Sequence, residues 1–189
     1  MNNYPNAKVR HRRKQAELRY AKQRQRNILA KPGAHEFILI LDNLKAGFNV
    51  PKIFRSGQAF GAKEIHLVNI GVFDPAPAKG AFKYVPAKFH ESFADCYATL
   101  KDSGYTFFIL EPANSTALHE IELPKKSCFI LGNEELGISF KPETYPDFKR
   151  LKIAQSGAVD SLNVSIAASI VMYQYNVNHP LASSLSKSE

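Results

Sequence analysis

Short apolar segments alternate with helical patterns along this chain, and this alternation constrains the fold more than any other feature. Five segments have the length and composition of buried strands, and they lie at 35–44, 64–70, 106–110, 127–132 and 150–155. Between and after them, the apolar spacing and capping residues of helices occur at 49–62, 92–105 and 161–176. Such alternation predicts an α/β fold with a mostly parallel sheet and helices on both faces.

Length and composition favour one globular domain. The chain has 189 residues, of which 44% are hydrophobic, and we expect the domain to span 35–178 with a short polar tail at 179–189. No apolar run approaches the roughly 18–20 residues of a membrane span. No apolar segment of the kind found in a secretory signal follows the basic N-terminus. We therefore expect a cytoplasmic protein without a membrane partner.

The cysteines and histidines give no metal-binding pattern in the sequence. Cys96 and Cys128 form no CxxC motif, and the six histidines are scattered along the chain. We interpret the cysteines as reduced structural thiols. No metal site is expected, which disfavours a metal-dependent hydrolase.

Positive charge is concentrated at the N-terminus. Residues 1–32 contain ten Lys or Arg and one Glu, whereas residues 33–189 contain 15 basic and 16 acidic side chains. A segment with this charge suits a polyanion, because each neutralised phosphate releases counterions. We predict that residues 1–34 form a basic arm that is mobile or loosely helical when no polyanion is bound. A solubilising tail is the alternative.

Polar residues follow three of the predicted strands. Asp42 and Asn43 come directly after the first strand, and the segments GNEELGIS (132–139) and QSGAVDSLNV (155–164) follow two later ones. In open parallel sheets, ligands bind outside the carboxyl ends of the strands. We therefore expect these segments to meet in one site. Neither a GxGxxG fingerprint nor a P-loop is present, which disfavours a classical dinucleotide or Walker site.

The start of the last predicted helix allows two interpretations. Ser161 is a plausible N-cap, in which case Asn163 and Ser165 would face solvent. Alternatively, Ser161 and Asn163 point into a site from the helix N-terminus. Capping and a role in the site are compatible.

Three ordered motifs, with the spacing between them, resemble the SpoU, or TrmH, family of SPOUT RNA methyltransferases. They are NVPKIFRSGQAFGA (49–62), FILGNEELGIS (129–139) and LKIAQSGAVDSLNVSIAASI (151–170), and the resemblance covers about residues 35–176. It implies an α/β SPOUT domain with a C-terminal trefoil knot. It further implies S-adenosylmethionine as cofactor, a homodimer, and methylation of a ribose 2′-hydroxyl in tRNA or rRNA. The basic arm would then bind RNA, through Arg10, Arg12, Arg13, Lys14 and Arg19.

The resemblance also assigns site residues. The catalytic set carried over comprises Asn49, Arg55, Glu134, Ser161 and Asn163, and the cofactor-binding set comprises Glu111, Gly132, Ile153 and Leu162. In the family the arginine is the proposed general base. A guanidinium keeps its proton in proteins, so Arg55 is better suited to clamp a phosphate and stabilise the developing alkoxide charge.

One departure from the family pattern concerns residues 50–54. The family has small or aliphatic residues there, whereas this chain has Val-Pro-Lys-Ile-Phe. An alternative function follows from this difference. The chain could be a catalytically weak RNA-binding or ribosome-assembly factor that retains the methyltransferase fold.

Overall fold

The structure is a computed structural model that describes residues 7–112, 114–158 and 161–181. A seven-stranded sheet in the order β3-β2-β1-β6-β4-β7-β5 forms its centre. All pairings between these strands are parallel. The strands are β1 (Ile38–Asp42), β2 (Glu64–Val68), β3 (Ala87–His90), β4 (Thr106–Leu110), β5 (Thr116–Ala117), β6 (Ser127–Leu131) and β7 (Lys149–Lys152). The predicted mostly parallel α/β sheet is confirmed.

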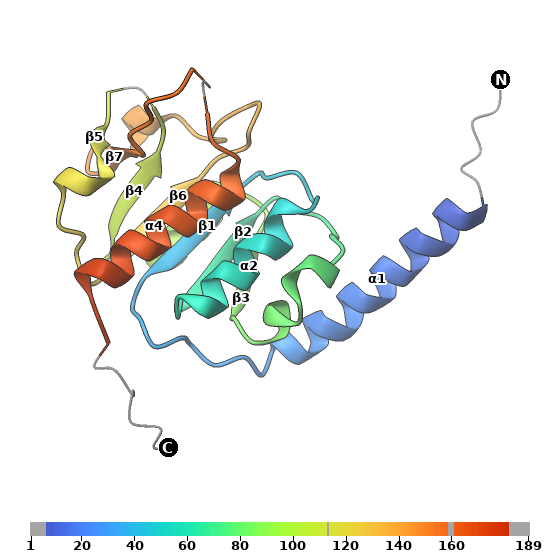
Figure 1. Ribbon diagram of the computed structural model, residues 1–189. Helices are drawn as coiled ribbons and strands as arrows, with labels where there is room; N and C mark the ends of the chain where they lie inside the picture. Colours follow the sequence, from blue (N-terminus) through green and yellow to red (C-terminus); the bar gives the residue numbers. More distant parts are fainter. Residues whose placement is uncertain (1–6, 113, 159–160, 182–189) are drawn as a thin grey trace, which may run out of the picture.

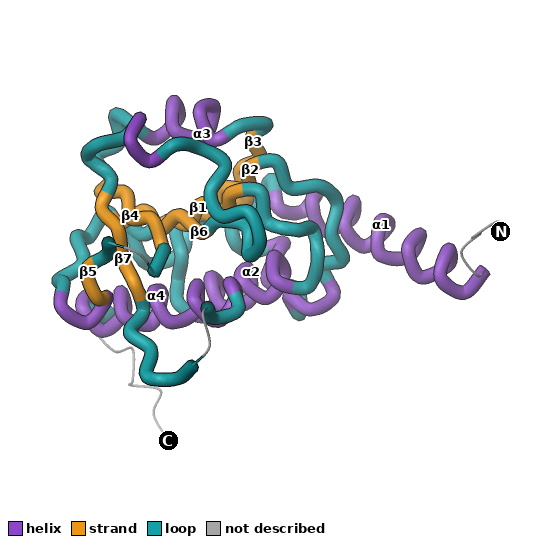
Figure 2. The backbone as a smooth tube through the Cα atoms, turned by 90° about the horizontal axis from the view of Figure 1, so that it is seen from above, coloured by secondary structure: helices purple, strands orange, loops and turns teal. Residues whose placement is uncertain are grey.

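Helices cover both faces of the sheet. Helix α3 (Phe93–Leu100) lies on one face, and α2 (Asn49–Ala59) and α4 (Val164–Asn178) lie side by side on the other (Figures 1 and 2). Leu39 and Leu41 belong to the core beneath α2 and α4, whereas Ile38 and Ile40 belong to the core beneath α3. A strand buried on both faces reads as an unbroken apolar run, which explains the sequence around β1.

The sequence analysis did not predict two short strands. β3 has the polar sequence AKFH and forms one edge of the sheet, and β5 has only two residues at the opposite edge. Edge strands are often short and polar, so their sequences lack the apolar signal of central strands. Helix α4 also begins later than predicted, at Val164, because Asn163 and not Ser161 is its N-cap.

Most of the predicted basic arm forms one continuous helix, α1 (Ala7–Asn27). Its first half projects from the body (Figures 1 and 2), and residues 8–15 are all exposed. Its second half is docked: Tyr20 is only 5% exposed, with its ring 5.1 Å from that of Phe73 and 5.6 Å from that of Phe82. The expectation of a loosely ordered arm is therefore wrong for this half of the helix, because one large aromatic side chain buries enough surface to hold it.

Two polar contacts fix the docked half of α1. Arg19 donates from Nε and Nη2 to the two carboxylate oxygens of Asp74, at 3.1 and 2.7 Å. Asn27 donates to the carbonyl of Val85 at 2.7 Å and accepts from the backbone N–H of Ala87 at 3.0 Å. The second contact ties the helix to edge strand β3. None of the helices in the described ranges is long and apolar enough to cross a membrane.

Candidate active site

The three predicted polar segments meet at one edge of the sheet. They follow the carboxyl ends of β1, β6 and β7, and the N-terminal turns of α2 and α4 point to the same edge (Figure 1). Because all the strands are parallel, their carboxyl ends lie together.

A chain of hydrogen-bonded side chains, which we call the amide chain, joins the loop after β6 to the first turn of α2 and to the start of α4. Asn49 in the first turn of α2 donates from Nδ2 to Oε1 of Glu134, and its Oδ1 accepts from Nδ2 of Asn163 at 3.1 Å. Oδ1 of Asn163 accepts in turn from the backbone N–H of Ser165 at 3.0 Å and from its hydroxyl at 2.6 Å. Asn163 therefore caps α4 and contacts the site at once. Ser165 is buried, so the solvent-facing interpretation is wrong for this residue, whereas Asn163 is exposed.

The loop after β6 is fixed by residues that the sequence analysis did not assign to the site. Asn133 accepts at Oδ1 from the backbone N–H groups of Glu135 and Leu136, at 2.9 and 3.1 Å, and donates to the carbonyl of Asn43 at 2.8 Å. Asx turns of this kind set the direction of a loop. Their only sequence signal is an Asn directly after a Gly at a strand end. The result is a loop that presents Glu134 to Asn49.

Buried Asp42 closes the same loop. Its carboxylate accepts from the backbone N–H of Ser139 at 2.6 Å and from the Ser139 hydroxyl at 2.7 Å. Burial raises the pKa of Asp42, and the two hydrogen bonds from Ser139 offset part of this rise. An exposed ion pair between Lys45 and Glu135, at 2.5 Å, adds a further link between the loops after β1 and β6.

Gly132 is required by the fold of this loop. A Cβ atom at Gly132 would lie 2.6 Å from the carbonyl carbon of Gly137 and 2.7 Å from the backbone nitrogen of Ile138. The loop returns on itself through backbone hydrogen bonds between Asn133 and Gly137. A close backbone approach thus explains the glycine independently of any ligand.

Two adjoining cavities of about 400 and 410 Å³ open beside the amide chain. Both are within the size range of small-molecule sites. They share the lining residues Leu110, Glu111, Pro112, Ser161, Leu162 and Ala167. Gly132 lines one cavity and Ile153 the other. All four residues predicted to bind a cofactor therefore lie on the walls of one composite space, together with Ser161.

Glu111 is one of the charged residues that line this space, together with Glu134 and Lys152. Its Oε1 lies 2.8 Å from Nη1 of Arg150, which partly neutralises the carboxylate. The same oxygen is buried and accepts no aligned hydrogen bond within the described part of the chain. The backbone N–H of Glu111 donates to the carbonyl of Leu151 at 3.0 Å, so Glu111 is held in the cavity wall by this bond and by Arg150.

Arg55 lies apart from the amide chain. It is exposed on α2, six residues and about 9 Å of helix rise beyond Asn49. No hydrogen bond or ion pair holds its guanidinium among the residues that the structure describes. The five predicted catalytic residues thus fall into three places. Glu134, Asn49 and Asn163 are connected by hydrogen bonds, Ser161 lies on the cavity wall, and Arg55 lies on an outer surface.

The residues that depart from the family pattern are mostly core residues. Val50, Pro51, Ile53 and Phe54 are buried, and only Lys52 of the five is exposed. The ring of Phe54 lies 5.0 Å from that of Phe82 and 6.2 Å from that of Phe73. These are the same two rings that receive Tyr20. The larger side chain at position 54 therefore belongs to the aromatic cluster on which α1 docks.

The predicted RNA-binding side chains differ in their surroundings. Arg10, Arg12, Arg13 and Lys14 are all exposed on the projecting half of α1, where Arg13 also pairs with Glu17 at 3.2 Å. Arg19 is bound to both carboxylate oxygens of Asp74. The geometry makes Arg19 an anchor of the helix and leaves the other four cations available to a ligand.

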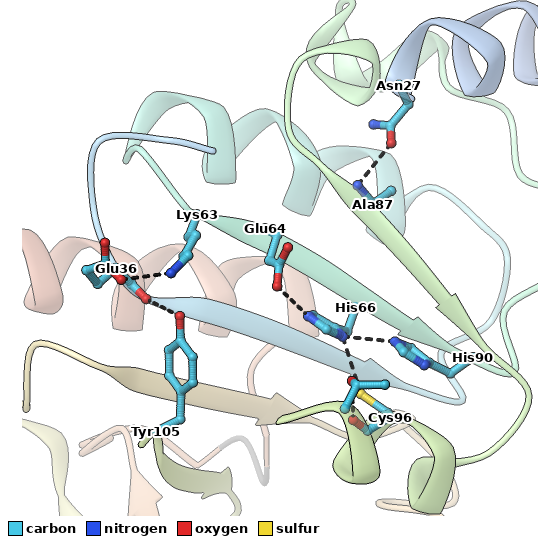
Figure 3. Close-up of polar contacts among 10 residues, drawn as sticks. Asn27, Glu36, Lys63, Glu64, His66, Ala87, His90, Cys96 and Tyr105 are labelled. Carbon is cyan, nitrogen blue, oxygen red and sulfur yellow. Dashed lines mark hydrogen bonds and ion pairs between the residues drawn. The ribbon is translucent and has the colours of Figure 1, made fainter. Parts of the chain in front are cut away.

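The expectation of scattered histidines is wrong for two of them. His66 on β2 and His90 on β3 lie against each other and against Cys96 on α3 (Figure 3). Parallel pairing of β2 and β3 brings together residues 24 positions apart, which the linear sequence does not indicate. This cluster lies beneath α3 and is separate from the amide chain.

Comparisons with known proteins agree with this fold and site. The SpoU rRNA Methylase family matches residues 36–173. A protein of Staphylococcus saprophyticus assigned to the TrmH family of tRNA/rRNA methyltransferases is 31% identical over 142 residues, covering 72% of this chain and 57% of that protein. The tRNA (guanosine(18)-2'-O)-methyltransferase of Escherichia coli strain K12 is 27% identical, covering 74% of this chain and 62% of the enzyme.

A solved structure shares the fold. The AdoMet-bound rRNA methyltransferase from Sinorhizobium meliloti superposes with a TM-score of 0.70 at 22% identity, covering 83% of this chain and 61% of that one. Together, the parallel sheet, the polar loops at its carboxyl edge and the matched profile define a SpoU-type α/β protein. The chain belongs to the SpoU rRNA methylase family. It spans 57% and 62% of the length of the two curated relatives described above.

Proposed function

We propose that this chain is an S-adenosylmethionine-dependent methyltransferase that methylates a ribose 2′-hydroxyl in tRNA or rRNA. The observation that carries the proposal is the amide chain Glu134–Asn49–Asn163 beside the two cavities. It joins the three motifs by which the chain resembles the family. The names of the relatives, which include a tRNA 2′-O-methyltransferase, support the same activity.

The composite cavity fits the proposed cofactor in size and donor set. Its walls combine apolar side chains, such as Ile153 and Leu162, with backbone groups and the carboxylate of Glu111. A nucleoside-containing ligand needs this mixture of apolar surface and few polar groups. When bound, S-adenosylmethionine supplies an electrophilic methyl group on its sulfonium. Glu111, Gly132, Ile153 and Leu162 would hold it.

The chain's own residues then have to position the attacking hydroxyl. A ribose hydroxyl is a weak nucleophile, so its orientation and the stabilisation of its developing charge determine the rate. Arg55 provides a fork of donors suited to a phosphate and to that charge. The hydrogen bond between Asn49 and Asn163 would hold the first turns of α2 and α4 together. It would thereby fix the position of Arg55 on α2 relative to the cavity beside α4.

A homodimer would bring Arg55 of one copy toward the cavity of the other. Helix α4 exposes an apolar stripe with the spacing of one helix face, formed by Ile166, Ile170, Tyr173 and Val177. Tyr173 is 60% exposed. Ser56, next to Arg55, contacts Ser169 of α4 at 2.8 Å, so Arg55 borders the same surface. A dimer of about twice 21.1 kDa by light scattering, lost in Tyr173→Glu, is expected.

The proposal includes a cytoplasmic location and a trefoil knot in the C-terminal part. The knot is supported by the position of β7 beyond β4, while α4 returns to the face shared with α2. The returning segment includes residues 159–160, which lie outside the described residues. A crystal structure that traces residues 131–178 without a break would decide whether the chain passes through its own loop.

The activity can be tested with purified full-length protein. We expect calorimetric titration to detect S-adenosylmethionine binding, and incubation with unmodified tRNA or rRNA to produce a linkage resistant to alkaline hydrolysis, because a methylated 2′-oxygen cannot attack the phosphate. Mapping these linkages in RNA from a strain that lacks the protein would identify the nucleotide. RNA binding without S-adenosylmethionine binding would contradict the enzyme and favour an RNA-binding or ribosome-assembly factor.

A further inference from the structure

We propose that His66, His90 and Cys96 form a zinc site near the β3 edge of the sheet, outside the cavities of the proposed active site. The three residues come from β2, β3 and α3, and one ligand atom of each lies within 4.8 Å of the other two. Two imidazole nitrogens and one thiol sulfur are donors that suit Zn²⁺.

The observed distances are close to those of a tetrahedral zinc centre. Nδ1 of His66 lies 2.9 Å from Nε2 of His90 and 3.5 Å from Sγ of Cys96 (Figure 3). With Zn–N bonds of about 2.0–2.1 Å and a Zn–S bond of about 2.3 Å, tetrahedral ligands are separated by roughly 3.3 Å between nitrogens and 3.5 Å between nitrogen and sulfur. The nitrogens of His66 and His90 therefore need to separate by only a few tenths of an ångström. A turn of the half-buried His90 ring would direct its nitrogen to the metal and set its distance to Cys96, which is at most 4.8 Å here.

Glu64 gives the cluster the second shell of a metal site. Its carboxylate lies 3.0 Å from Nε2 of His66. A carboxylate only accepts, so Nε2 carries a proton, and Nδ1 of a neutral His66 ring has a free lone pair directed at His90 and Cys96. Metal-bound histidines commonly donate their second N–H to a carboxylate in this way. Glu64 thus orients His66 as a metal ligand would be oriented.

The protons and the fourth ligand can be accounted for. Burial raises the pKa of Cys96 to about 12, so the thiol is protonated in the metal-free chain. Binding of Zn²⁺ would form the Zn–S bond with release of that proton to solvent, and His90 would carry its proton on Nδ1. His66 and Cys96 are buried, whereas His90 is only partly buried. Water reaching the site beside His90 would complete the four ligands.

Such a metal would join three elements, of which β3 contacts α1. It would connect edge strand β3 and helix α3 to β2, and β3 is the strand whose Ala87 N–H donates to Asn27 of α1 (Figure 3). Edge strands lack a neighbour on one side and gain from such a link. The site would therefore stabilise the edge strand to which Asn27 of the basic helix is hydrogen-bonded.

Metal binding to the tag-free, full-length protein tests the proposal directly. We expect one equivalent of Zn²⁺ to bind and to raise the midpoint of thermal unfolding, reversibly with EDTA. Cobalt should give the visible bands of a tetrahedral ion and a thiolate-to-metal charge-transfer band. Glu64→Gln should weaken zinc binding about 10- to 100-fold, the range for loss of an outer-shell partner.

Matched variants separate this site from adventitious binding. Cys96→Ser should abolish the charge-transfer band, and His90→Gln should abolish tight zinc binding. Cys128→Ala and His119→Gln should keep both the charge-transfer band and tight zinc binding. They change a buried cysteine and an exposed histidine outside the cluster. Failure of the unmodified protein to bind zinc or to give the cobalt bands would overturn the proposal. So would tight binding that survives in Cys96→Ser or His90→Gln.

Discussion

The side-chain amide of Asn163 donates to Oδ1 of Asn49 at 3.1 Å, across 114 positions of sequence, and this bond joins the first turns of α2 and α4. The other end of the same side chain caps α4. One residue thus sets where the last helix begins and how it lies against the loop of Glu134. Stability and activity can be separated by changing only one of its two functional groups.

Replacement of Asn163 should separate these two roles. Asp at this position keeps the capping oxygen and suits the helix N-terminus, so Asn163→Asp should keep its thermal stability. It cannot donate to Asn49, and loss of that hydrogen bond should lower methyl transfer about tenfold. Asn163→Ala should lose both the capping oxygen and the bond to Asn49, so its free energy of unfolding should fall by about 1 kcal/mol and its methyl transfer should fall as well. Unfolding curves and methyl-transfer rates measure the two effects.

Ser92→Ala provides the control for capping. Ser92 caps α3 through a capping box with Asp95, on the opposite face of the sheet from α4. This variant should lose a similar amount of stability and keep its activity. If Asn163→Asp were as active as the unmodified chain, the bond to Asn49 would have no role in the reaction.

Substitution of Arg55 should reduce methyl transfer without reducing cofactor binding. Removal of a donor to developing negative charge typically lowers a rate by about 10²–10³, and we expect Arg55→Ala to fall in this range. Arg55→Lys should recover little, because a single ammonium cannot reproduce the guanidinium fork.

Arg55 is not among the residues that line either cavity, so calorimetry should give unchanged S-adenosylmethionine affinity. Lys52→Ala, the other exposed cation of α2, should remain active. Near-normal rates in both Arg55 variants would exclude the proposed role.

The central fold could be predicted from the sequence because its signals are local. The runs around β1, β4 and β6 are mostly apolar, since the central residues of these strands are buried on both faces. The motifs also placed Asn49, Glu134 and Asn163 near strand ends. Their hydrogen bonds depend on which strands are neighbours, and spacing along the chain does not contain that information.

The features that the sequence did not predict arise from contacts between distant segments. His66 and His90 meet only through the pairing of β2 with β3. Tyr20 belongs to the arm that we expected to be mobile or loosely helical, but Phe73 and Phe82 pack against its ring. The proposed trefoil knot follows only from the resemblance to the family, because local rules treat knots as almost absent.

The stability of the chain should depend on the ionisation of Asp42. Burial raises the pKa of Asp42 in the folded chain, so the folded state binds this proton more tightly than the unfolded state. Between the unfolded and the raised folded pKa, the contribution of Asp42 to the free energy of unfolding therefore falls as pH rises. Asp42→Asn removes this titration. Urea unfolding of both proteins, from below the unfolded pKa of Asp42 to above its folded pKa, gives the difference in their free energies of unfolding. The free energy of the unmodified chain relative to Asp42→Asn should fall as pH rises through this range and then become constant. A difference that does not vary with pH would contradict the raised pKa.

The projecting half of α1 should supply salt-dependent RNA affinity and little chemistry. Removal of residues 1–18 leaves Tyr20, Arg24 and Asn27 in their contacts, so the body should stay folded, whereas removal of the whole arm would expose the aromatic cluster. If Arg10, Arg12, Arg13 and Lys14 each meet one phosphate, their loss should flatten the slope of log affinity against log salt by about 3–4. S-adenosylmethionine affinity should not change.

Salt titrations of RNA binding by three proteins test this expectation. They are the full chain, the chain without residues 1–18, and a full-length variant with Gln at positions 10, 12, 13 and 14. The truncated and Gln variants should share the flatter slope, because charge and not helix length determines counterion release. Equal slopes for all three proteins would show that the helix is a solubilising extension. The RNA would then be bound by the surface of α2 and α4 beside Arg55.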